Sequence, residues 1–370
     1  MNINDIALTL ETGIGVKTAA MLIAEFGSAD AIYDAIYDAT ATEIIRRTSI
    51  REPLAEQLTR KEAHHRAERE LAYIKKHGLT AIASTDADYP PLVREMSDPP
   101  HVLYVNGDVA ALRMRCVSMV GTRTLSTYGQ TMCDKLVRQL ADRVPDLCIV
   151  SGLAFGIDVH CHRAALRYGV PTVAVLANTL PGVTPAPHAD IARDIVAHGG
   201  AIVSECHSAS KQTGNFYLAR NRIIAGLSEG TIVVEAPFES GALSTADFAL
   251  GYDRTVMAVP GRGTDDMSKG TNALIKNQRA AMVCSGEDVI RALAWDLYVP
   301  EVGERPVTPA PGLSADALGL LGCVPGGDAV SVDALVEMTA LGHPALAPLL
   351  LELEFAGKIQ RLPGGSYTKI

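Results

Sequence analysis

The chain has 370 residues, of which 48% are hydrophobic and 20% are charged, and its formal net charge is −9. A chain of this length is expected to form more than one domain, and this composition is typical of a globular protein rather than a disordered one. The acidic balance argues against a nucleic-acid coat protein. It leaves room for a local basic patch, because salt screens each charge beyond about 8–10 Å.

The sequence gives no sign of a membrane or secreted protein. No apolar run reaches the length of about 18 residues that a membrane helix needs, and the acidic N-terminus lacks the basic region of a secretory signal. The seven cysteines are an odd number without a CxxC pair, which is typical of reduced thiols. We therefore expect a cytoplasmic protein with no membrane partner.

Residues 1–72 are predicted to form a small helical domain, because TAAMLIAEF and ADAIYDAIYDA have helical spacing and no strand-like run interrupts them. The segment TGIGVKTAA, residues 12–20, resembles a helix-hairpin-helix element. The Gly-Ile-Gly turn of such an element can hold a phosphate through backbone amides. A purely structural turn between two helices explains the same residues, so both interpretations stay open.

Residues 78–296 are predicted to form a Rossmann-like, doubly wound and mainly parallel α/β sheet. Short β-branched runs recur there, and each is followed by a stretch with helical spacing. The runs are residues 116–121, 147–152, 172–177, 201–205, 231–236 and 255–261. In such a sheet, ligands bind beyond the carboxyl ends of the strands.

The C-terminal part of the chain is predicted to be separate. Residues 297–312 are rich in proline and predict a linker. Residues 313–370 predict three short helices and a hairpin, which together resemble a winged helix. Ser314 and Ser331 are predicted helix N-caps, and Gly357 is predicted to end the third helix.

Three stretches at predicted strand ends open helices with small or hydroxyl-bearing residues. They are GTRTLSTYG (121–129), SGLAFGID (151–158) and PFESGALSTA (237–246). Free N–H groups at such helix starts bind anions, so together with Arg123 they predict a phosphate-binding groove. Gly152 and Gly156 are explained equally well by tight strand–helix packing, and Arg123 alone by an ion pair. Neither a GxGxxG fingerprint nor a P-loop is present.

The stretch from residue 206 to residue 228 is an aromatic and basic island in an acidic chain. It contains no acidic residue, but it contains Lys211, Arg220 and Arg222 together with two aromatic residues. On a helix, Phe216 and Arg220 fall on one stripe with apolar residues. A core position would leave the Arg220 charge in need of a partner. We therefore place Phe216 and Arg220 at the rim of the groove, and Arg222 in a structural ion pair.

Two stretches that look like metal or catalytic sites are predicted to be empty. The His-Cys-His run at 160–162 has i, i+2 spacing, which diverges on a helix, so no zinc site or other cofactor is expected. Asp158 and His162 have i, i+4 spacing and are predicted to be a pair on a helix surface.

The same stretches resemble the DNA-processing protein A family. The motifs MVGTRTLSTYG, SGLAFGIDVHCHRAAL, RNRIIAGLS and VVEAPFESGALSTADFAL follow one another here as they do in that family. The resemblance implies an extended Rossmann-like domain that binds single-stranded DNA without cleaving it. It also implies delivery of that DNA to the RecA recombinase in natural transformation, and formation of a homodimer.

The resemblance also implies a set of DNA-binding residues. Transferred onto this sequence, they are Arg123, Ser151, Gly152, Lys211, Phe216, Arg220, Asn221, Ser240 and Gly241. Two departures affect the detailed base contacts. TPAPH (184–188) stands where the family usually has a Tyr-Pro-x-x-Asn element, and FYLARNR stands in place of the commoner Phe-Pro-x-Arg-Asn-Arg.

An enzymatic alternative remains from the sequence. The predicted sheet topology also resembles nucleotide phosphoribohydrolases of the lysine-decarboxylase-like group, in which a Gly-Gly-x-Gly-Thr turn precedes a catalytic glutamate. Thr245 and Asp247 lie near the corresponding place, although the double glycine and the glutamate are missing. We expect a non-catalytic DNA-binding protein, with this nucleotide-processing enzyme as the alternative.

Overall fold

The computed structural model describes residues 1–38, 41–48, 50–59, 62–210, 215–295, 313–325, 329–362 and 366–369. The chain divides into two compact units, residues 1–300 and residues 301–370. The whole of the predicted linker at 297–312 lies outside the described residues, and so does Lys211. The domain borders read from the sequence therefore stay predictions.

The N-terminal region is helical, as its spacing predicted. Its described helices are α1 (Ile3–Leu10), α2 (Val16–Phe26), α3 (Ala29–Asp38), α4 (Ala41–Thr48), α5 (Glu52–Leu58) and α6 (Glu62–Lys76). The first helix starts at a capping box, in which the Asn2 and Asp5 side chains accept each other's backbone N–H. A short turn with Gly13 at φ +89° joins α1 to α2, and whether this turn binds a phosphate stays open.

One sheet forms the centre of the first unit, and its strand order in the described residues is β1-β2-β6-β5-β4-β3-β7-β8-β9. The strands are β1 (Thr80–Ala83), β2 (Val102–Gly107), β3 (Arg115–Val120), β4 (Leu147–Ser151), β5 (Thr172–Val175), β6 (Ala201–Ser204), β7 (Gly230–Val233), β8 (Thr255–Ala258) and β9 (Ala281–Met282). Neighbours from β6 through β9 pair in parallel, whereas β2 is antiparallel to both β1 and β6. The mainly parallel sheet is confirmed. The six predicted runs are β3 to β8.

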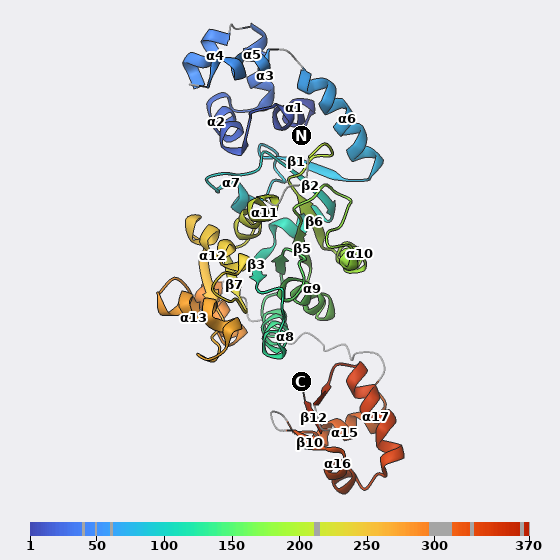
Figure 1. The fold of residues 1–370 in the computed structure, drawn as a ribbon. Helices are drawn as coiled ribbons and strands as arrows, with labels where there is room; N and C mark the ends of the chain where they lie inside the picture. Colours follow the sequence, from blue (N-terminus) through green and yellow to red (C-terminus); the bar gives the residue numbers. More distant parts are fainter. Residues whose placement is uncertain are drawn as a thin grey trace. The chain divides into compact units, whose positions relative to one another are not determined.

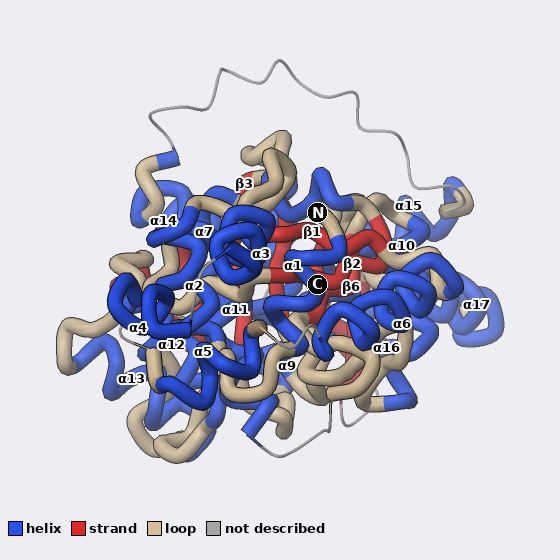
Figure 2. The backbone as a smooth tube through the Cα atoms, turned by 90° about the horizontal axis from the view of Figure 1, so that it is seen from above, coloured by secondary structure: helices blue, strands red, loops and turns tan. Residues whose placement is uncertain are grey.

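Helices cover both faces of this sheet (Figures 1 and 2). Alternate residues of β3 point to opposite faces, so Val117 and Met119 pack with α8 (Thr127–Ala141), α9 (Ile157–Arg167) and α14 (Gly286–Ala292). Cys116 and Val120 pack on the other face with α11 (Asn215–Gly226), α12 (Gly241–Gly251) and α13 (Lys269–Lys276). The remaining described helices of this unit are α7 (Pro91–Arg94), η1 (Val109–Arg113), η2 (Ala186–His188), α10 (Ala189–Ala197) and η3 (Asp266–Ser268).

The N-terminal helices share one apolar core with part of the sheet domain. Ala67 and Ile74 of α6 belong to the same buried cluster as Leu176 and Leu180, which follow β5. Polar contacts strengthen the junction, because the buried Glu70 carboxylate of α6 accepts hydrogen bonds from the backbone N–H and the hydroxyl of Ser208. The loop that leads from β6 toward α11 is therefore tied to the N-terminal helices.

The second unit has the winged-helix pattern that the sequence predicted. Its elements are α15 (Ala315–Cys323), β10 (Val330–Ser331), α16 (Val332–Thr339), α17 (His343–Phe355), β11 (Ile359–Leu362) and β12 (Ser366–Lys369). Ser314 and Ser331 cap α15 and α16 as predicted. Gly357, at φ +63°, follows the end of α17, and β11 pairs antiparallel with β12.

No helix in the described part of the chain is by itself both long and apolar enough to span a membrane. The consecutive helices α16 and α17 meet that test of length and composition only when they are taken together, across a bend of 108°.

Candidate nucleic-acid interface

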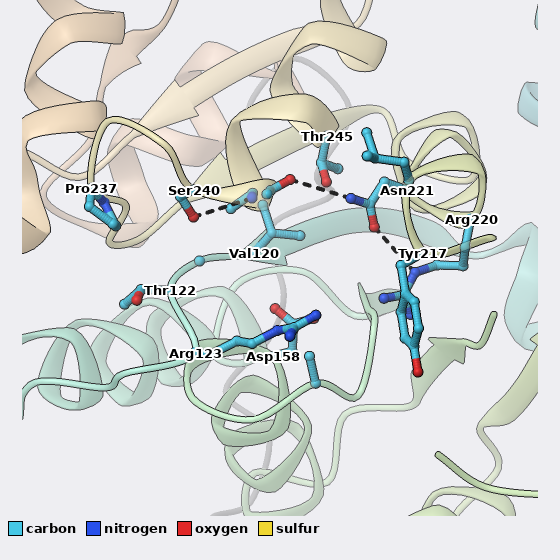
Figure 3. Close-up of a pocket in the computed structure, with 15 residues that line it drawn as sticks. Val120, Thr122, Arg123, Asp158, Tyr217, Arg220, Asn221, Pro237, Ser240 and Thr245 are labelled. Atoms are coloured by element: carbon cyan, nitrogen blue, oxygen red, sulfur yellow. Dashed lines mark hydrogen bonds between the residues drawn. The ribbon is translucent and has the colours of Figure 1, made fainter. Parts of the chain in front are cut away.

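A pocket opens where the strand order of the sheet reverses. The chain moves from β3 through β4 and β5 to β6 on one side, and then returns to place β7 on the other side of β3. Ligands of doubly wound sheets bind at this switch point, beyond the carboxyl ends of the strands. The pocket there has a volume of about 420 Å³ (Figure 3). Its lining residues are Val120, Gly121, Thr122, Arg123, Ala154, Asp158, Tyr217, Leu218, Arg220, Asn221, Pro237, Ser240, Gly241, Ala242 and Thr245.

Helix starts surround this pocket, as the sequence predicted. The Ser240 hydroxyl caps α12 by accepting the N–H of Ala242 at 3.3 Å, and Ser240 and Gly241 both line the pocket. The Ser126 hydroxyl caps α8 by accepting the N–H of Gly129 at 3.0 Å and also donates to the buried Glu235 carboxylate. Ser126 is therefore a structural cap, and it is not a pocket-lining residue.

Arg123 is the exposed cation of the pocket wall. It lies in the loop after β3, and its side chain points into the pocket (Figure 3). Within the described residues, no hydrogen bond or ion pair holds its guanidinium. An unpaired, solvated guanidinium at a switch-point pocket is available to a phosphate. The ion-pair explanation that the sequence allowed for Arg123 therefore has no partner among the described residues.

Arg220 lies in the floor of the pocket, so the predicted position at an exposed rim is wrong. Only 6% of the residue is exposed. Its guanidinium donates to the carbonyl oxygen of Gly152 at 2.7 Å and to the carbonyl oxygen of Val175. These carbonyls end β4 and β5, so the α11 face that carries Arg220 is turned toward the sheet. Burial lowers the pKa of Arg220, and the nearby Asp158 carboxylate opposes that shift.

Asp158 is the buried counter-charge of Arg220, and the prediction of a surface pair with His162 is wrong. Burial raises the pKa of Asp158, whereas Arg220 and the backbone N–H groups of Gly121, Gly152 and Ala154 act to lower it. His162 is fully buried, and its Nδ1 lies 2.7 Å from the Thr172 hydroxyl. Burial lowers the pKa of His162 to about 3, so this imidazole is neutral at neutral pH.

Ser151 and Gly152 lie beneath the pocket rather than in its wall. The Ser151 hydroxyl is fully buried and donates to the carbonyl oxygen of Met119 at 2.6 Å, which contradicts a direct contact of this side chain with DNA. A Cβ atom on Gly152 would stand 2.6 Å from Nη1 of Arg220 and 2.7 Å from Oδ2 of Asp158. Close packing against this buried charge pair therefore accounts for Gly152.

The aromatic residue of the pocket is Tyr217, one position after the predicted Phe216. Phe216 is half-buried and does not line the pocket, whereas Tyr217 is 43% exposed and does (Figure 3). Helical spacing offers the signal that was missed, because Tyr217 shares a face with Arg220 and Asn221 at i+3 and i+4. Asn221 donates to the carbonyl oxygen of Gly241 at 3.3 Å and to the Ser244 hydroxyl at 3.1 Å, which ties α11 to α12.

Arg222 has the structural role that the sequence predicted. Its guanidinium forms an ion pair with Glu205 and donates to the carbonyl oxygen of Asp98 at 2.7 Å. Burial raises the pKa of Glu205, and Arg222 opposes that shift. Arg220 and Arg222, two positions apart on α11, therefore have different partners on the two sides of the helix.

The residues of the enzymatic alternative are not assembled in the pocket. Thr245 lines it, but Asp247 does not and instead pairs with Arg279 at 2.6 Å on the surface. Among the described residues, no group of three or more histidine, cysteine, aspartate or glutamate side chains is placed to hold a metal ion.

Fold and site together define a Rossmann-like protein that has an arginine-bearing pocket at its switch point and a winged helix as its C-terminal unit. Residues 80–294 match the family model of the DNA recombination-mediator protein A, and residues 304–365 match that of the DprA winged helix domain. The chain belongs to the DNA recombination-mediator protein A family, which has a DNA-processing role in recombination.

Individual relatives agree with this assignment. Protein Smf of Escherichia coli (strain K12) is 35% identical over 308 residues, which cover 80% of this chain and 79% of that protein. The X-ray structure of DprA from Streptococcus pneumoniae is similar with a TM-score of 0.67 and 28% identity, and covers 79% of this chain and 98% of that one. A structure of DNA processing protein A from Helicobacter pylori, which describes the single-stranded DNA binding mode of that protein, is similar with a TM-score of 0.52 and 28% identity. That likeness covers 59% of this chain and 96% of the other.

Proposed function

We propose that the switch-point pocket binds the backbone of single-stranded DNA and that the protein delivers the strand to a RecA-type recombinase without cleaving it. The observation that carries the proposal is the exposed Arg123 guanidinium in a pocket between helix starts. The similarity to Helicobacter pylori DprA supports the choice of a single strand as ligand.

The remaining parts of the proposal follow the family. Natural transformation is the process in which a bound single strand would be protected and passed on, and a homodimer is the assembly that we expect. Arg123, Asn221, Ser240 and Gly241 line the pocket, and we propose that they contact the strand, with Arg220 as the charge beneath them. The separation of Asp247 from the pocket disfavours a phosphoribohydrolase-like activity.

Single-strand preference and salt dependence test this proposal. If about four phosphates are neutralised per protomer, the logarithm of the affinity is expected to fall against the logarithm of salt concentration with a slope of about −3. The measurement is a fluorescence-anisotropy titration of one oligonucleotide as single strand and as duplex. Equal affinity for the two forms, or an affinity independent of salt, would contradict a groove that binds the single-strand backbone.

The winged helix is expected not to bind duplex DNA. Recognition helices of winged helices need basic or amide side chains for base edges and phosphates. The helix α17 sequence has Glu352 and Glu354 but no lysine, arginine, asparagine or glutamine, and residues 313–370 contain six acidic against three basic residues. Removing residues 301–370 is therefore expected to leave most of the single-strand affinity. Micromolar or tighter binding of duplex DNA by residues 313–370 alone would contradict this assignment.

A further inference from the structure

Exposed aromatic side chains gather at the edge of the sheet where the pocket opens. Among the aromatic residues whose side chains the structure describes, those with large exposed fractions are Tyr128 (41%), Phe155 (49%), Tyr217 (43%) and Phe238 (63%). They follow β3, β4, β6 and β7, so all of them lie toward the carboxyl ends of parallel strands. Of these four residues only Tyr217 lines the pocket. The Tyr128 hydroxyl donates to the Pro260 carbonyl oxygen at 2.6 Å, which leaves Phe155 and Phe238 without a role.

The segment that carries Phe155 packs on the loop that carries Arg123. The next residue, Gly156, packs so closely on the Arg123 loop that a Cβ atom there would lie 2.7 Å from the Arg123 Cα. Ile157 N–H also donates to the Thr122 carbonyl oxygen at 3.1 Å. The Phe155 ring meets the His188 ring edge to face, with their centroids 4.7 Å apart. His188 thus supports one side of the ring, while half of the side chain stays exposed.

Phe238 stands on the β7 side of the same loop. The Thr122 N–H donates to the Glu235 carbonyl oxygen at 2.7 Å, which joins the Arg123 loop to the end of β7. Pro237 then lines the pocket, and Phe238 follows it with 63% of the residue exposed. The two phenylalanines therefore come from the segments that border the Arg123 loop on its two sides.

This arrangement has the chemistry of a single-strand site. An exposed ring next to an unpaired guanidinium offers a stacking surface for a base and a charge for its phosphate. Phenylalanine has no hydrogen-bonding group, so such platforms accept any base. The acidic chain has only six phenylalanines, and two of them are exposed on the segments that border the Arg123 loop.

We propose that Phe155 and Phe238 stack nucleobases on either side of the phosphate held at Arg123, so that the strand crosses the sheet edge from β4 to β7. The inference rests on the proposed function, because it needs a single strand in the pocket. It adds two sequence-tolerant base platforms that lie outside the predicted set of DNA-binding residues.

The test compares single-strand binding by the native full-length protein with binding by Phe155→Ala and Phe238→Ala. Each substitution is expected to lower the affinity for a base-bearing strand at least about fivefold. The slope of log affinity against log salt is expected to stay unchanged, because no charge is removed. Phe155→Trp and Phe238→Trp are expected to retain the affinity, and Phe155→Leu and Phe238→Leu to lose it. Met21→Ala on α2, which also removes an exposed apolar side chain, is the matched control.

An abasic strand of the same length separates stacking from other roles of the rings. It has the same phosphates without bases, so both alanine variants are expected to bind it as the native protein does. An equal loss on the abasic strand would make the rings structural and overturn the inference. If the native protein binds single strands through Arg123 but the alanine variants bind equally well, the inference fails and the proposed function stands. Failure of the native protein to bind any single strand would overturn both.

Discussion

Replacing Arg220 with alanine is expected to destabilise the first unit by about 3–5 kcal/mol. The substitution removes the partner of a buried carboxylate and leaves the carbonyl oxygens of Gly152 and Val175 without their donor. An exposed position would instead have predicted weaker DNA binding at unchanged stability. Urea unfolding of the full chain measures the difference.

Two further measurements show whether the unpaired buried carboxylate of Asp158 causes the loss of stability in Arg220→Ala. The double variant Arg220→Met with Asp158→Asn removes both charges and is expected to lose less stability than Arg220→Ala. Burial already raises the pKa of Asp158, and loss of Arg220 raises it further. A carboxyl whose pKa is higher in the folded state favours folding at low pH and opposes it as pH rises. The loss in free energy of unfolding caused by Arg220→Ala is thus expected to become smaller as pH falls from neutral. A loss that does not depend on pH would contradict this explanation.

Replacing Arg123 with alanine is expected to have the opposite profile, with weaker binding and unchanged stability. The guanidinium is exposed and unpaired within the described residues. A charge-assisted contact is worth about 1.5–3 kcal/mol, so the single-strand affinity is expected to fall roughly tenfold or more. The slope of log affinity against log salt is expected to become shallower by about 0.7, which corresponds to one phosphate of a single strand.

Arg138→Ala is the matched control for this variant. Arg138 is also exposed, and it lies near the end of α8, away from the helix start beside the pocket. The substitution Arg138→Ala removes one positive charge, as Arg123→Ala does, so it controls for the general effect of a more acidic chain. Equal losses in the two variants would show a diffuse electrostatic effect and contradict a specific contact at Arg123.

The sequence predicted the parallel core of the fold because its strands are uninterrupted apolar runs. The runs for β3 and β4 are buried along their whole length or nearly so, and such runs are recognisable without any partner. The strands β1, β2 and β9 escaped prediction. β1 and β9 are short and partly exposed, and the antiparallel pairing of β2 depends on a partner, β6, that is distant in sequence.

The sequence predicted where along the chain the site lies, but not how deeply each of its side chains is buried. Helix starts at strand ends predicted a groove in this place, and that rule pointed to Arg123 and to the stretch 237–246. The family resemblance singled out Ser240 and Gly241 within that stretch, and all three residues line the pocket. Helical spacing could not show that the Arg220 side of α11 faces the sheet, because its partners Gly152 and Val175 lie 68 and 45 residues away in sequence. For the same reason the sequence predicted Phe216 at the rim of the groove, whereas its neighbour Tyr217 lines the pocket.

The apolar core that α6 shares with the sheet domain restricts the exchange of the N-terminal helices between members of the family. The sequence alone suggests that these helices form an independent domain. In the structure, however, the Glu70 carboxylate accepts a hydrogen bond from the Ser208 N–H, and Ala67 packs in the same buried cluster as Leu176. A hybrid that joined these helices to the sheet domain of a distant relative would have to match both surfaces. Recombination between genes of this family should therefore be poorly tolerated at the border after α6.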